Sequence, residues 1–161
     1  MATEIKKIIL SEDCKKISVE FATAQPTTVV INDSNNASIT LESDDFEYAD
    51  GVLSFIYTHT AAFVGVLQIL PKDSDGTTTL TPAYSVAKCR TICCITNLLY
   101  AAMECTCKCD KCKEDLLRAE KVTLFLQAAT YEAEHNANLT QAVKNYNKAT
   151  ELCVEVCACG C

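Results

Sequence analysis

Hydrophobic and polar residues alternate along the first half of the chain, in short runs bounded by turn-forming residues. Ile17, Val19 and Phe21 alternate with polar neighbours, and the same pattern returns at residues 29–31, 39–41 and 53–57. A period of two is typical of half-buried strands. A continuous apolar run over residues 63–70 ends at Pro71, and Asp50-Gly51 predicts a tight turn. Six or seven short strands with these turn signals predict an Ig-like β-sandwich over residues 1–80.

The pattern changes to helical spacing in the second half, over residues 81–161. Thr81-Pro82 predicts the N-cap and first turn of a helix. The residues that follow at helical spacing are Cys89, Ile92, Cys93, Thr96, Leu99, Ala102 and Met103. We expect Cys89 and Cys93 to be small core residues rather than metal ligands, because a free cysteine packs as a small hydrophobe.

Two further helices are predicted, joined by a short turn. Residues 114–134 carry one stripe of Leu117, Leu124, Ala128 and Tyr131 and another of Val122, Phe125 and Ala129. Two stripes predict a helix covered on two sides. The last helix has apolar or small residues at helical spacing from Leu139 to Cys157, and Asn138 with Gln141 resembles a capping box. Such a hairpin cannot cover its own apolar face, so the first helix, the β half or a neighbouring subunit is expected to cover it. The predicted class is α+β: an N-terminal β-sandwich, then a three-helix part with cysteine-rich ends.

Charge and hydropathy exclude some partners. The 161 residues carry a net charge of −7, and the fourteen basic residues form no cluster. We therefore expect no direct nucleic-acid contact. No apolar run approaches the roughly 18 residues of a membrane span, and the N-terminal apolar run is too short for a signal peptide. We expect folding in a reducing cytoplasm, which ranks metal binding and free thiols ahead of disulfides unless the mature protein leaves the cell.

The twelve cysteines provide the one candidate constellation. A chain that runs up, down and up again is expected to bring the end of the first helix beside the end of the third. The sulfurs of two groups would then meet: Cys105, Cys107, Cys109 and Cys112 with Cys153, Cys157, Cys159 and Cys161. Thiolates are soft ligands that suit a structural zinc site. Disulfides formed in a mature particle and free thiols are the two other readings of the same groups.

Catalytic signatures are weak. His59 and His135 are far apart in sequence and lie in different halves. The Cys109–Cys112 C-x-x-C lacks the strand-to-helix setting of a thioredoxin site, and neither a Gly-rich phosphate loop nor an H-E-x-x-H motif occurs. We therefore expect no enzymatic activity.

The order of parts resembles small virion proteins of crAss-like and related tailed phages. Three features carry the resemblance. Asp13-Cys14-Lys15-Lys16 leads into a strand of an Ig-like segment, Cys89-Arg-Thr-Ile-Cys93-Cys94 opens the helical part, and an alanine-rich hairpin begins and ends in cysteines. The resemblance implies a virion location, assembly in the host cytoplasm, and a ring of identical subunits in the head-to-tail connector or tail. Its partners would be copies of itself and neighbouring virion proteins. Two alternatives stay open: a cysteine-based metal-binding or redox protein, and a host-directed binding module that uses the aromatic residues of the β half.

Overall fold

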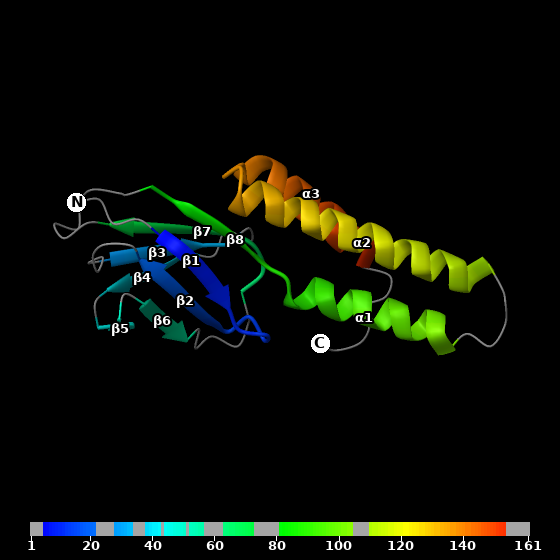
Figure 1. Ribbon diagram of the computed structural model, residues 1–161, viewed down its shortest axis with the longest axis horizontal. Helices are drawn as coiled ribbons and strands as arrows, with labels where there is room; N and C mark the ends of the chain where they lie inside the picture. Colours follow the sequence, from blue (N-terminus) through cyan, green and yellow to red (C-terminus); the bar gives the residue numbers. More distant parts are fainter. Residues whose placement is uncertain are drawn as a thin grey trace. The chain divides into compact units, whose positions relative to one another are not determined.

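The computed structural model describes residues 5–21, 28–33, 38–42, 44–50, 52–56, 63–72, 81–104 and 110–153. The chain forms two compact units, Met1–Ala87 and Lys88–Cys161. The first unit consists of strands and the second of helices (Figure 1). The α+β class is therefore confirmed, with two antiparallel sheets preceding three helices.

Within its described residues, the β unit contains two four-stranded sheets whose paired strands are all antiparallel. The first has the order β1-β2-β6-β5 and the second the order β4-β3-β7-β8. Edge strands of different sheets, β1 and β8, contact each other. The strands span Ile5–Leu10 (β1), Lys16–Phe21 (β2), Thr28–Asn32 (β3), Ser38–Glu42 (β4), Glu47–Ala49 (β5), Val52–Ile56 (β6), Gly65–Lys72 (β7) and Ala83–Ala87 (β8).

Alternation along the strands places the apolar side chains in the core. In β2, Ile17, Val19 and Phe21 are buried while Ser18 and Glu20 are partly exposed. Val29 and Ile31 are likewise buried in β3. These strand predictions are confirmed, because the period of two separates the two faces of a sheet.

Of two strand-ending signals in the β half, one is confirmed and the other is not. The tight turn predicted at Asp50-Gly51 is confirmed, since Ala49 pairs with Val52 and Asp50 has a φ of 52°. Pro71 was expected to end its strand, but β7 continues through it to Lys72. The strand tolerates proline there because pairing with β8 stops at Ile69, which leaves Pro71 paired on the β3 side alone.

The predicted helix start at Thr81-Pro82 was wrong. Residues Ala83–Ala87 form β8, which pairs with β7 from Gly65 to Ile69. The first helix begins at Cys89, after Lys88, whose carbonyl accepts hydrogen bonds from the Ile92 amide and the Thr91 hydroxyl. Thr81-Pro82 is a local signal for a helix start. The segment forms a strand instead, because hydrogen bonding to β7 stabilises it there.

Helices α1 (Cys89–Glu104), α2 (Asp110–Glu134) and α3 (Leu139–Cys153) form the second unit. In it α2 packs along both other helices, while α1 and α3 contact each other over a shorter stretch (Figure 1). The shared core consists of Cys94 and Leu98 from α1, Ala119 and Val122 from α2, and Ala149 and Cys153 from α3. None of the described helices is both long and apolar enough to cross a bilayer.

The α2–α3 turn follows its sequence signals in part. The Asn138 amide donates to the Glu132 carbonyl, and Ala137 has a positive φ of 49°, as in a Schellman C-cap. The Asn138 side chain accepts from the Gln141 amide at 3.1 Å, so the predicted N-cap is confirmed. The reciprocal half of the capping box is replaced, because the Gln141 side chain donates to Asn145 instead.

Candidate functional site

Among the cysteines predicted as metal ligands, Cys153 is the one whose surroundings the structure describes. Its sulfur forms a disulfide with Cys94, with the two Cα atoms 5.9 Å apart. Both side chains are buried in the core that the three helices share. Cys153 therefore joins α3 to the second turn of α1, rather than to the cysteines expected beyond the end of α1.

The other seven members of the two predicted groups cannot be placed in a site. The backbone of Cys112 lies in α2, and Cys105, Cys107, Cys109, Cys157, Cys159 and Cys161 lie outside the described residues. Within the described part of the chain, no group of three or more His, Cys, Asp or Glu residues could hold a metal ion. Structural zinc at the remaining cysteines stays a prediction.

Disulfides are more prominent than the sequence argument expected. Cys14, Cys89, Cys93, Cys94 and Cys153 are all disulfide-bonded. Cys89 and Cys93 were expected to be free core thiols, and the ranking of metal and free thiols ahead of disulfides is wrong for these five. The argument failed because it inferred the oxidation state from an assumed cytoplasmic location.

The second candidate site consists of large apolar side chains that are exposed on α1 and on α2. On α1, Ile92, Leu99 and Met103 are spaced seven and four residues apart, so they lie in one row. On α2, Leu117, Leu124 and Tyr131 recur every seven residues, with Leu116 beside them. These large side chains are exposed, Met103 most of all at 79%. We call these seven residues the α1–α2 face.

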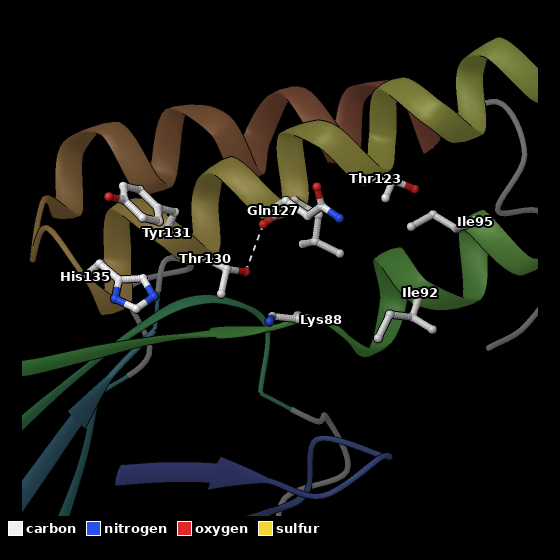
Figure 2. Close-up of a pocket in the computed structure, with 9 residues that line it drawn as sticks. Lys88, Ile92, Ile95, Thr123, Gln127, Thr130, Tyr131 and His135 are labelled. Carbon is white, nitrogen blue, oxygen red and sulfur yellow. Dashed lines mark hydrogen bonds between the residues drawn. The ribbon is translucent and has the colours of Figure 1, made fainter. Parts of the chain in front are cut away.

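A groove of about 410 Å³ lies between the two helices at one end of this face (Figure 2). Ile92 and Ile95 line it from α1, and Tyr131 is among the residues that line it from α2. The remaining lining residues are Lys88, Thr123, Leu126, Gln127, Thr130 and His135. No residue of α3 is among the described residues that line the groove.

The polar atoms in the groove are few and partly engaged. The hydroxyls of Thr123 and Thr130 donate to the carbonyls of Ala119 and Leu126, each one turn earlier. The Tyr131 and His135 rings lie 5.0 Å apart, centroid to centroid. The described lining residues include two basic side chains, Lys88 and His135, and no carboxylate. The groove is therefore an apolar hollow with a basic margin.

Sequence periodicity found these residues but misplaced them. Ile92, Leu99 and Met103 belong to the series at helical spacing from Cys89 to Met103, in which Cys89 and Cys93 were expected to be core residues. The structure instead buries Thr91, Cys94 and Leu98, about 100° around the helix. The α2 stripe of Leu117, Leu124 and Tyr131 was expected to be covered, and it is more than half exposed at each position. His59, the other histidine considered for chemistry, lies outside the described residues.

Comparisons with known proteins add little. No protein-family model matches the chain, and no curated protein matches it. Among solved structures, the chain is similar to part of the chitinase ChiW from Paenibacillus sp. str. FPU-7, described as a multi-modular enzyme expressed on the bacterial cell surface. The identity is 14%, the match covers 53% of this chain and 8% of that chain, and the TM-score is 0.38. A likeness of this size carries no argument about fold or activity.

Proposed function

We propose that the chain is a virion structural protein, which forms an oligomeric ring in the head-to-tail connector or tail of a tailed phage and bridges adjacent virion proteins. The resemblance of its layout to small crAss-like phage proteins supplies the setting. The α1–α2 face carries the proposal physically, because it is a surface that a neighbour would cover.

The exposure of this face supports a protein partner. Each of its seven residues is between 41% and 79% exposed. Large apolar side chains that gather on a surface mark protein–protein interaction sites, whereas single exposed ones are ordinary.

We also propose that the β unit is an Ig-like sandwich. In an Ig domain, strands A, B, E and D form one sheet and strands C, F and G form the other. If β1 to β8 correspond in sequence to A, B, C, C′, D, E, F and G, the observed orders become A-B-E-D and C′-C-F-G. The contact between β1 and β8 fits this assignment, because it brings edge strands of the two sheets together. Such a unit would act as a scaffold that presents sheet edges to neighbours.

The disulfides agree with a protein that works outside a reducing cytoplasm. Disulfides persist in oxidising surroundings, including virion surfaces. Five disulfide-bonded cysteines among the described residues fit a particle protein that is made in the cytoplasm and oxidised after the particle is released.

The proposal is tested by native mass spectrometry and negative-stain electron microscopy of the full chain, purified without reductant. We expect a discrete oligomer with a closed outline, and binding to at least one purified connector or tail protein. A chain that stays monomeric and binds no virion component would refute the assignment. Metal analysis of the same sample addresses the cysteine-based alternative, for which exchangeable metal in stoichiometric amount is the expected sign.

A further inference from the structure

Helix α1 has a narrow apolar attachment to the other two helices. Cys94 and Leu98 are its buried residues in the core that the three helices share, with Ile95 partly buried beside them. Among the described residues of α1, Leu98 is the one large apolar side chain that is fully buried. The noncovalent attachment of α1 therefore depends mainly on one turn of the helix.

The α2–α3 hairpin is buried over a longer stretch. Ala129 and Ala133 of α2, and Ala142 and Tyr146 of α3, are buried although they lie outside the core shared with α1. The two helices pack along each other over their length (Figure 1). The hairpin thus has apolar packing of its own that does not involve α1.

The Cys94–Cys153 disulfide provides the second attachment of α1. The two Cα atoms are 5.9 Å apart, which is within the range that a disulfide spans. Cys94 is 0% exposed and Cys153 is 6% exposed. Thiol–disulfide exchange requires a thiolate to reach one of the two sulfurs. The docked helix therefore shields the bond from a thiol in solution.

We propose that Cys94 and Cys153 form a redox switch for α1. Oxidation fixes the helix on the α2–α3 hairpin, and reduction allows it to detach. The bond and the docked helix favour each other, because the two sulfurs meet only when α1 lies against α3. Local detachment of α1 is also the motion that exposes the sulfurs to exchange. The oxidation state of the pair and the position of the helix are therefore coupled.

The redox partner is a small-molecule thiol with its disulfide. On reduction, its thiolate attacks one of the two sulfurs, forms a mixed disulfide and releases the other cysteine as a thiolate. A second small-molecule thiolate then resolves the mixed disulfide. The protein gains two electrons and two protons, and two molecules of the thiol are oxidised to one disulfide. Oxidation of the two cysteines follows the same steps in reverse.

The switch is independent of the virion assignment. It describes what α1 does wherever the ratio of thiol to disulfide changes. In reducing surroundings α1 detaches from the hairpin, and in oxidising surroundings it is fixed there. Full reduction also removes the disulfides of Cys89 and Cys93, which lie in the first two turns of α1.

Kinetics of reduction test the coupling between docking and exchange. The full chain, purified without reductant, is treated with dithiothreitol, and the thiols released over time are alkylated and assigned by mass spectrometry. Leu98→Ala removes the main apolar contact of the docked helix, so we expect the Cys94–Cys153 bond to be reduced on the order of tenfold faster or more. The matched control is Tyr100→Ala, which removes a side chain that is 60% exposed on the same helix and should leave the rate unchanged.

Circular dichroism of each variant verifies that the helices remain folded. If Leu98→Ala does not fold, Ile95→Ala takes its place, because Ile95 is only partly buried against the same core and its loss is milder. We expect the same acceleration, smaller in size.

Hydrogen exchange tests whether α1 detaches. In the reduced chain, we expect the amides of residues 95–104 to exchange on the order of 100-fold faster than in the oxidised chain, because an isolated helix of this length is marginal in water. The amides of residues 142–149 in α3 should stay protected in both. The double variant Cys94→Ala with Cys153→Ala, kept oxidised, should show the fast exchange at residues 95–104. That result assigns the effect to this bond rather than to those of Cys89 and Cys93.

The outcomes decide the switch without touching the ring. Equal protection of α1 in the oxidised and reduced chains overturns it, and so does a reduction rate that Leu98→Ala does not change. Loss of protection in α1 and α3 together also overturns it, because the helical unit then opens as a whole. Native mass spectrometry tests the ring separately, and a monomeric chain that passes both tests above keeps the switch and loses the virion assignment.

Discussion

Cys94 in the second turn of α1 and Cys153 in the last turn of α3 are joined by a disulfide across 59 residues of sequence. Helices α1 and α3 otherwise contact each other over a short stretch. The bond fixes α1 to the α2–α3 hairpin at the centre of the helical core, where Leu98 and Val122 also meet. It therefore holds α1 against α3 within the helical unit.

Removal of this disulfide should destabilise the helical unit. Closing a loop of this length lowers the entropy of the unfolded chain, and the expected loss of stability is about 4 kcal/mol. The change is the double variant Cys94→Ala with Cys153→Ala, and the measurement is urea unfolding followed by circular dichroism. Mass spectrometry of the wild-type digest should show the two peptides linked. A digest in which both residues carry free thiols would contradict the pairing.

The α2–α3 interface should reject a larger side chain at Ala149. Ala149 is fully buried and shares the core with Val122 and Leu98. Ala149→Leu adds volume where none is available, and we expect a loss of about 1–3 kcal/mol in the free energy of unfolding. Lys144→Leu, at an exposed position of the same helix, is the matched control and should change stability by less than about 0.5 kcal/mol. Equal effects from the two variants would show that the interface is not close-packed.

The turn between α2 and α3 should become more stable when Ala137 is replaced by glycine. Ala137 holds a left-handed conformation, with φ at 49°, which crowds its Cβ against the backbone. Ala137→Gly removes the crowding at the C-cap, and the expected gain is about 0.5–1 kcal/mol in the free energy of unfolding. Ala128→Gly, within α2, serves as the comparison and should lower stability, since its backbone is helical. A loss of stability at position 137 would be inconsistent with the left-handed cap.

The β1–β2 turn should lose part of its order in acid. The Asp13 carboxylate accepts hydrogen bonds from the Ser11 hydroxyl at 2.6 Å and the Lys15 amide at 3.1 Å, and these lower the pKa of Asp13. Because the folded pKa lies below the unfolded one, this contribution is fully present above the ordinary aspartate pKa. It is lost as the pH falls through the lowered value. NMR titration of the Asp13 side chain should give a pKa below the ordinary aspartate value, and Ser11→Ala should raise that pKa. If Ser11→Ala left the pKa of Asp13 unchanged, the hydrogen bond from the Ser11 hydroxyl would not be what lowers that pKa.

Local patterns in the sequence determined most of the secondary structure. Alternation at Ile17, Val19 and Phe21 predicted β2, and Asp50-Gly51 predicted the turn before β6. Asn138 predicted the start of α3. These features depend on side-chain periodicity and on backbone preferences of neighbouring residues, and both can be read from a few consecutive positions. The strand β8 was missed because its stability comes from pairing with β7, far away in sequence.

Tertiary structure alone decided which apolar stripe is covered and which cysteines pair. Periodicity shows that Ile92, Leu99 and Met103 share one side of α1, but it does not show whether another helix lies against that side. The core formed around Cys94 and Leu98 instead, because those residues meet Val122 and Ala149 when three helices pack together. The Cys94–Cys153 bond likewise depends on a Cα separation of 5.9 Å, a distance that only the folded chain defines.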